Sequence, residues 1–316
     1  MRGFATALRS RLHTDLHERL ISLQEAVTDM KQRLDTAEGE NAYLRLRVDA
    51  AARDAERAAS IARHIYDEEP RNRRLLHELR RSEDYELAFT ESDPLVSFLV
   101  PTYDSYGTLR DVALPSILGQ SHANLEVIVV GDCAPPETAE AIAAIDDPRV
   151  RYVNRTIRGP YPEDRSRRWY VVGTPPVNDA LALARGRWIG ILGDDDAVRP
   201  NHTEWLLAAA RERRLEHCYG RQQVHFAEGE PITLGEFPPA LGGWGLQAAI
   251  YHSGLRYFES ELSDAIYEEP NDWSKCRRMM RAGVRIGMID KVVVDKHERR
   301  RRSATEWRAG DVPVAD

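Results

Sequence analysis

Three consecutive carboxylates follow an apolar run past the middle of the chain. Residues 189–192 read as a buried strand, and Asp194, Asp195 and Asp196 come directly after the glycine that ends it. Adjacent carboxylates repel one another, so the triplet is expected where water or a divalent cation reaches it. Oxygen-rich sites suit Mg²⁺ or Mn²⁺, and these ions in turn hold phosphate groups. The triplet therefore predicts a cation site, with a solvated acidic turn as the alternative.

Short apolar runs alternate with amphipathic segments from residue 95 onward, which predicts an α/β fold with a mostly parallel sheet and helices on both faces. The carboxyl ends of such strands meet at one edge, where open α/β folds bind ligands, so the triplet is expected at that edge. The expected strands are 95–100, 125–130, 150–153 and 187–192, with later ones at 218–226 and 231–237 and an extended segment at 284–294. The expected helices are 106–120, 136–145, 177–184, 203–216 and 272–282.

The first 70 residues are a different kind of sequence, in which mostly apolar residues recur at alternating steps of four and three. These residues form the seam. That heptad spacing predicts a coiled coil, most simply a homodimer, and a single helix folded back on the rest of the chain is the alternative. Asn41 falls on the seam, where a polar residue can fix register and partner number. The seam residues are Leu16, Leu20, Leu23, Val27, Met30, Leu34, Ala37, Asn41, Leu44, Val48, Ala51, Ala55, Ala58, Ala62 and Ile65.

These patterns divide the chain into four parts. We expect a coiled-coil helix over 1–70, a linker with a short basic helix over 71–94, an α/β domain over 95–298 and a basic, disordered tail over 299–316. The 316 residues carry a formal net charge of −7, which gives no support for bulk binding to nucleic acid.

The chain shows no signal peptide and no apolar run near the roughly 20 residues that span a bilayer. Cys133, Cys218 and Cys276 lack metal-type spacing, which favours reduced thiols and a cytoplasmic location. The arginine run 299–302 leaves peripheral contact with a membrane open, although a solvated run is the simpler interpretation.

Several short motifs occur in a telling order. The order is Val-Pro-Thr-Tyr at 100–103, Val-Val-Gly-Asp at 129–132, Asn-Asp-Ala-Leu at 178–181, the Asp triplet with its following proline, and Asn-Asp-Trp at 271–273. Over about residues 95–298 this order resembles the family 2 glycosyltransferases of GT-A (Rossmann-like) fold. The resemblance implies an inverting, metal-dependent hexosyltransferase of polysaccharide or glycoconjugate biosynthesis. It would move a sugar from a nucleotide-diphosphate donor, most simply a UDP-sugar, to an acceptor hydroxyl that the sequence does not name.

The resemblance also assigns a metal site, for Mn²⁺ or Mg²⁺. Asp195 matches the metal-binding acid of the family's DXD motif, counted back from Pro200. Asp196 supports that site, and His297 lies where some relatives present a histidine to the metal or the diphosphate. Asp194 would face the donor ribose or share the metal, and which aspartate binds the metal directly stays open.

Donor, base and acceptor positions follow in the same way. Asp272 matches the catalytic base, which would take the proton from the acceptor hydroxyl, although a helix cap also explains it. Trp244 and Trp273 would stack on the acceptor sugar, with a place in the core as an equal alternative for Trp273. The residues implied in donor binding are Pro101, Thr102, Tyr103, Asp132, Arg158, Asn178 and Asp194.

Three positions depart from the family pattern, because Gly131, Gly193 and Asn271 stand where many relatives carry an acid. They leave a second hypothesis open, a non-catalytic GT-A-like module that binds a nucleotide-sugar or serves assembly on a coiled-coil stalk. A nucleotidyltransferase is disfavoured, because the loop 101–107 has no lysine or arginine.

Overall fold

The computed structural model describes residues 2–63 and 68–297, with side chains described from residue 22 onward. It divides into two units, residues 1–59 and 60–316. The tail expected at 299–316 and the side chains of Leu16, Leu20 and Ile65 lie outside the described residues.

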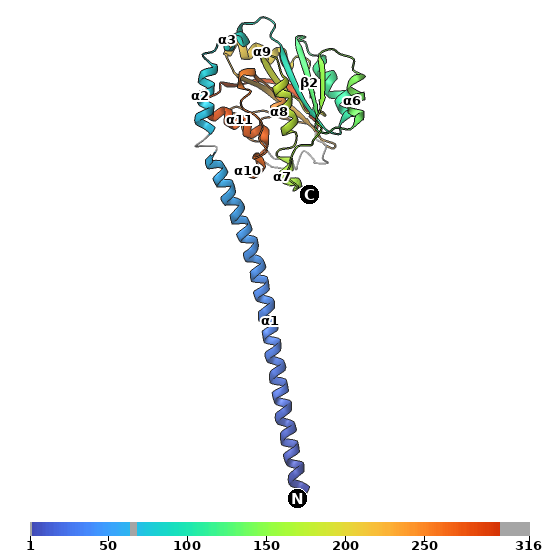
Figure 1. Ribbon diagram of the computed structural model, residues 1–316, viewed down its shortest axis with the longest axis vertical. Helices are drawn as coiled ribbons and strands as arrows, with labels where there is room; N and C mark the ends of the chain where they lie inside the picture. The colour runs from blue at the N-terminus through green and yellow to red at the C-terminus, as the bar shows by residue number, and fades with distance from the viewer. Residues whose placement is uncertain (1, 64–67, 298–316) are drawn as a thin grey trace. The chain divides into compact units, whose positions relative to one another are not determined.

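The first unit consists of the greater part of helix α1 (Arg2–Arg63), drawn as one unbroken helix in Figure 1. Every side chain described from residue 22 to residue 59 is exposed, the apolar seam included. The long helix is therefore as predicted, whereas the partner that would cover its seam stays a prediction. In the part of the chain that the structure describes, no helix is both long and apolar enough to cross a membrane.

The second unit is built on one mixed sheet. Its described strands follow the order β3-β2-β1-β4-β8-β6-β9-β5, with β7 paired to β6. The first four of that order are parallel neighbours, whereas β8 joins β4 and β6 antiparallel. The strands are β1 (Val96–Thr102), β2 (Leu125–Gly131), β3 (Val150–Asn154), β4 (Trp188–Ile191), β5 (Ala197–Val198), β6 (His217–His225), β7 (Ile232–Leu234), β8 (Ala249–His252) and β9 (Ile286–His297).

Side chains alternate between two apolar clusters on the two faces of the sheet. Along β1, Phe98 and Val100 enter one cluster with α3 and α9, and Leu99 enters the other with α2, α8 and α11. The predicted α/β architecture is thereby confirmed. The helices of this unit are α2 (Glu69–Leu79), α3 (Glu83–Thr90), α4 (Tyr106–Thr108), α5 (Leu114–Leu118), α6 (Pro136–Ala143), α7 (Arg165–Trp169), α8 (Thr174–Leu183), α9 (His202–Arg213), α10 (Asp264–Tyr267) and α11 (Asn271–Ala282).

The segment expected to be a linker is folded onto this sheet. Pro70 lies in the first turn of α2, where its missing N–H costs nothing. The acidic part of the segment forms α3. Helix α2 packs beside α11 (Figure 1), while Tyr85 and Phe89 of α3 are buried against the other face.

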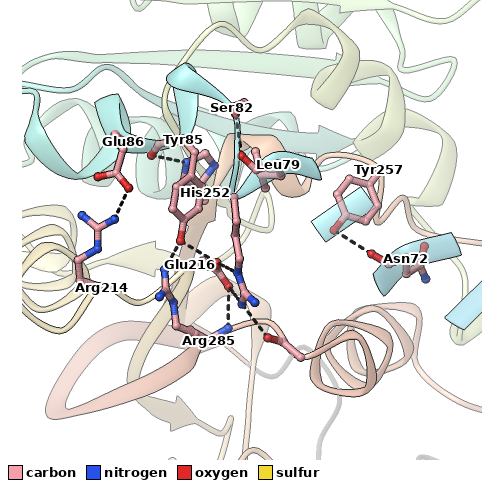
Figure 2. A network of polar contacts seen from close by, with 12 residues as sticks. Asn72, Leu79, Ser82, Tyr85, Glu86, Arg214, Glu216, His252, Tyr257 and Arg285 are labelled. Carbon is pink, nitrogen blue, oxygen red and sulfur yellow. Dashed lines mark hydrogen bonds and ion pairs between the residues drawn. The ribbon is translucent and has the colours of Figure 1, made fainter. Parts of the chain in front are cut away.

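A buried carboxylate fastens that segment. Glu216, at the start of β6, is fully buried and accepts hydrogen bonds from Arg80 Nε (2.6 Å), the Tyr85 hydroxyl (2.8 Å) and the backbone N–H of Arg285 (2.8 Å). Figure 2 shows Tyr85 and Arg285 converging on Glu216. Burial raises the pKa of Glu216, but the bonds from Arg80 and the other donors outweigh it, so the pKa lies below its usual range.

We expect Glu216→Ala to lower the free energy of unfolding by about 3–5 kcal/mol, because it leaves buried donors and the Arg80 charge without their acceptor. Denaturant unfolding at neutral pH measures this. The matched control is Glu86→Ala, which removes the exposed pair with Arg214 and should change the free energy of unfolding far less.

The same carboxylate predicts a pH effect. A depressed pKa in the folded state means that Glu216 stabilises the fold above its unfolded pKa and that this contribution is lost as the pH falls through the folded pKa. The stability difference between wild type and Glu216→Gln should therefore shrink in acid, and a constant difference down to about pH 2 would contradict it.

Candidate functional site

The carboxyl ends of β1 and β4 are joined by a side-chain hydrogen bond. The Thr102 hydroxyl donates to Asp194 Oδ2 at 2.8 Å, across 92 residues of sequence. The next parallel strand meets the same point, because the backbone N–H of Asp132 donates to the Thr102 carbonyl at 2.9 Å. Three strand ends thus converge as a parallel sheet requires, and they bring together residues that the sequence implied in donor and metal binding.

The triplet at the end of β4 is electrostatically strained. Asp196 is buried, and burial together with the charge of Asp195 raises its pKa to about 7, against the opposing influence of Lys296. A side chain added at Gly193 would meet Asp195 Oδ1 and Asp196 Oδ2, each at 3.1 Å. Two carboxylate oxygens therefore flank one small space beside Gly193, a space that an acid at this position would fill.

The end of β9 lies against the triplet. The backbone N–H of His297 donates to Asp196 Oδ1 (2.9 Å), and its Nδ1 lies 3.2 Å from the Asp195 carbonyl. The ring stacks on His225 at 5.2 Å between centroids. The sequence predicted His297 near the metal, and the structure places it beside the acids. Within residues 22–63 and 68–297, however, no group of three or more His, Cys, Asp or Glu side chains is arranged as a metal site.

Asp132 is surrounded by donors from the loop after β3. Its carboxylate accepts the Tyr161 hydroxyl at 2.6 Å and the backbone N–H of Gly159 at 3.0 Å, and Arg155 Nε lies 3.3 Å away. Burial, and then the bond to Asp132, raises the pKa of Tyr161, so the hydroxyl remains a donor. Asp132 thus fixes the loop that carries Arg155 and Arg158.

An acid at Gly131, as in many relatives, would force neighbouring side chains to shift. A Cβ there would lie 2.6 Å from Asn154 Oδ1 and 2.8 Å from the Tyr152 hydroxyl. Asn154 clasps the following turn by hydrogen bonds with the backbone of Ala134. Cys133 in that turn has φ 58°, in the left-handed region that favours glycine.

The remaining residues that the sequence implied in binding the sugar donor differ in their contacts. Arg158 lies over the ring of Tyr103 at 3.8 Å to the centroid, so these two predicted residues meet at the mouth of the loop. Pro101 is partly exposed at the end of β1. Asn178 is bonded to another part of the chain, because both ends of its amide bond the backbone of Ser260, at 2.9 and 3.0 Å.

The acceptor side centres on the first turn of α11. Asp272 accepts the backbone N–H of Trp273 at 2.7 Å, so its carboxylate does satisfy the helix terminus. Burial raises its pKa, with Lys296 opposing. Asn271, in place of the family's first acid, donates to the Thr174 hydroxyl at 2.7 Å.

The two tryptophans differ in exposure. Trp244 is buried in the cluster below α11, whereas Trp273 is partly exposed and lies 6.4 Å from it between ring centroids. Of the two, Trp273 alone presents surface to a ligand in this conformation.

Sequence reasoning missed two lysines. Lys296 acts on both Asp196 and Asp272, and so relates the two halves of the site. Lys275 is fully buried one turn after Asp272, and burial lowers its pKa to about 7. The i, i+3, i+7 spacing of Asp272, Lys275 and Met279 was a usable signal for Lys275, because it puts all three on one helix face. Nothing local marks Lys296.

The fold defines the class of an α/β domain with acids at its strand ends, and comparison with known proteins narrows that class. Residues 97–161 match the family model described as "Glycosyl transferase family 2". The chain is 37% identical over 142 residues to the succinoglycan biosynthesis protein ExoO of Rhizobium meliloti, over 45% of this chain and 37% of that one. It is 26% identical to the UDP-Glc:alpha-D-GlcNAc-diphosphoundecaprenol beta-1,3-glucosyltransferase WfgD of Escherichia coli, over 42% of this chain and 47% of that one.

Solved structures agree on the fold. The S. aureus TarS fragment 1–349 in complex with UDP superposes with a TM-score of 0.52 at 17% identity, over 64% of this chain and 60% of that chain. Residues 97–161 are thus similar to the family 2 glycosyltransferases, and the second unit has a GT-A-like fold. The chain spans about half or less of the length of the two curated relatives described.

We expect Cys133→Gly to stabilise the protein by about 0.5–1 kcal/mol. The substitution removes roughly 1–2 kcal/mol of strain from the left-handed backbone conformation. Part of this gain is lost because glycine has greater conformational freedom in the unfolded chain. Thermal and denaturant unfolding measure the gain. The control is Cys133→Ala, which keeps the Cβ and should bring no gain. Equal stabilisation by both would assign the effect to the thiol and not to the backbone.

Proposed function

We propose that the protein is an inverting glycosyltransferase that moves a sugar from a nucleotide diphosphate to an acceptor hydroxyl. The convergence of the β1, β2 and β4 ends carries the proposal, with Thr102 bonded to Asp194 and Asp132 beside them. This arrangement supports a donor lying across the strand ends, its base between Tyr103 and the Arg158 loop and its diphosphate toward the triplet. A uridine nucleotide is the favoured donor, because WfgD is named for UDP-Glc.

The strained triplet fits a divalent cation, Mn²⁺ or Mg²⁺. The oxygens of Asp195 and Asp196 flank one space, and burial together with the charge of Asp195 raises the pKa of Asp196, both of which a nearby positive charge would oppose. Such an ion, when bound, stabilises the negative charge that develops on a departing diphosphate. Asp194, held by Thr102, then orients toward the donor ribose, and His297 closes the side of the site at β9.

Asp272 is the proposed general base. Its raised pKa, due to burial, brings it closer to the working pH, which strengthens a carboxylate as a proton acceptor. It takes the proton from the acceptor hydroxyl while that oxygen bonds to the anomeric carbon. The bond to the nucleotide diphosphate breaks on the opposite face, so the configuration inverts in one displacement. The acceptor sugar would rest on Trp273, and names such as succinoglycan biosynthesis protein support a growing glycan as the acceptor class.

We expect Asp195→Ala to abolish sugar transfer and to weaken Mn²⁺-dependent UDP binding, because it removes one of the oxygens beside Gly193. Donor turnover and calorimetric titration with UDP, each with and without Mn²⁺, measure both effects. Asp93→Asn is the control, since this exposed residue precedes β1 at the opposite edge of the sheet. Full activity in Asp195→Ala would remove the metal assignment.

We expect Asp272→Asn to lower turnover by about 10²–10⁴-fold while sparing donor affinity. An asparagine oxygen can still accept the Trp273 N–H, so the change isolates the charge from the helix cap. The wild-type rate should fall at low pH, as Asp272 is protonated through its raised pKa. The residual rate of the variant should lack this decrease in acid. A loss of thermal stability with unchanged turnover would assign Asp272 to capping alone.

Titration of the wild-type chain with UDP-sugars distinguishes the enzyme from a binding module. Metal-dependent binding followed by donor hydrolysis or transfer supports the enzyme. Tight binding with no release of UDP across a panel of donors would instead support the non-catalytic module, which the acid-free positions Gly131 and Asn271 favour.

A further inference from the structure

The first unit, taken by itself, presents an exposed apolar stripe along its helix. Numbering the heptad so that Asn41 is at position a, the described a and d residues from Leu23 to Ala58 all lie on one face of α1 and are exposed. Large side chains keep about half or more of their surface in water, such as Leu34 at 59% and Leu44 at 56%. A regular apolar stripe over five heptads is not expected on a helix that is stable alone in water. The stripe therefore indicates a partner helix.

We propose that α1 pairs with α1 of a second copy of this chain as a parallel, in-register, two-stranded coiled coil. The pairing is independent of the glycosyltransferase activity proposed above. Its occupant is a second copy because the stripe complements itself, both in charge and in its one polar position.

The charges that flank the stripe are opposite across a parallel pair. Residues at g contact the partner's e residues five positions further along the chain. Arg33 (g) then meets the partner's Glu38 (e), and Glu40 (g) meets the partner's Arg45 (e). Lys31 and Arg47, the other charged e and g residues before Asp54, face alanines, so the in-register pair brings no like charges together.

Charge alone does not select the orientation. An antiparallel pair that overlaps along the whole seam also joins opposite charges, such as Glu40 with the partner's Arg47. In that pair, however, Asn41 faces the partner's Leu44, and the amide oxygen is buried without a donor. In the parallel pair Asn41 faces the partner's Asn41, and each amide can bond the other while Nδ2 keeps its bond to the Ala37 carbonyl at 2.9 Å. An unpaired buried amide costs more than exposed ion pairs contribute, so Asn41 decides for the parallel pair.

The side chains at a and d agree with two strands. Val27 and Val48 occupy a, and Leu23 and Leu44 occupy d, the distribution that favours parallel dimers over higher assemblies. Gly39 falls at f, on the outer face, where it weakens the helix without disturbing the contact.

The first test is the mass of the full chain in solution, by sedimentation or light scattering at micromolar concentration. Wild type should be a dimer. Leu44→Asp, at d, should weaken dimerisation by at least about 100-fold, because it puts a charge into the seam. Leu46→Asp is the matched control, since Leu46 is at f and is 68% exposed, and it should leave the dimer intact. A monomeric wild type, a trimer, or equal behaviour of the two variants would overturn the proposal.

The second test fixes the orientation by oxidative cross-linking. Ala37→Cys, at d, should form a covalent dimer, because position 37 faces the partner's 37 only in the parallel register. Gly39→Cys, at f, and the wild type, whose Cys133 is partly exposed, should not. If Ala37→Cys fails to cross-link but the double variant Ala37→Cys with Val48→Cys succeeds, the helices are antiparallel and the proposed register is wrong.

Discussion

Repulsion among neighbouring carboxylates at the end of β4 is the constraint around which the second unit is organised. Asp196 is buried although Asp194 and Asp195 stand beside it, and its raised pKa records the cost. A fold tolerates such a cost where other groups hold the acids in place. Thr102 holds Asp194 from β1, and the backbone of His297 holds Asp196 from β9. The acids are thus fixed from two sides before any ligand arrives, which is the condition for a preorganised charge-binding site.

In the same unit, the attachment of α2 and α3 to the sheet depends on a different buried carboxylate. Glu216 joins α2 and α3 to the start of β6 and to Arg285 just before β9 (Figure 2). Because β6 and β9 are parallel neighbours, Glu216 holds their amino ends together, ahead of the register shifts between Tyr219 and Gln222. The segment after the long helix is therefore part of the domain's framework, and a variant truncated to begin at residue 95 would lose Arg80 and Tyr85 as donors to Glu216.

Local pattern was enough to predict the parts of the site that lie at strand ends. The apolar runs that form β1, β2 and β4 place Thr102, Asp132 and Asp194 at one edge, whatever the loops do. Local pattern could not predict contacts between residues that lie far apart in the sequence. Nothing local ties Tyr85 to Glu216, 131 residues away, although Tyr85, Ala88 and Phe89 at helical spacing signalled a buried helix face in the acidic segment. The resemblance implied that Trp244 would stack on the acceptor sugar, yet this tryptophan packs into the core, because its neighbouring glycines permit a tight turn inward as readily as outward.

Strand β9 supplies the step that relates the donor and acceptor halves. It pairs antiparallel with the two-residue strand β5 directly after the triplet, Ala197 opposite Asp295. That pairing sets the next residue, Lys296, where its charge acts on both Asp196 and Asp272. A cation shared by two carboxylates favours ionisation of each, so Lys296 opposes the burial that raises both pKa values. The donor-side acid and the proposed base therefore share one cation, which favours the charged form of both.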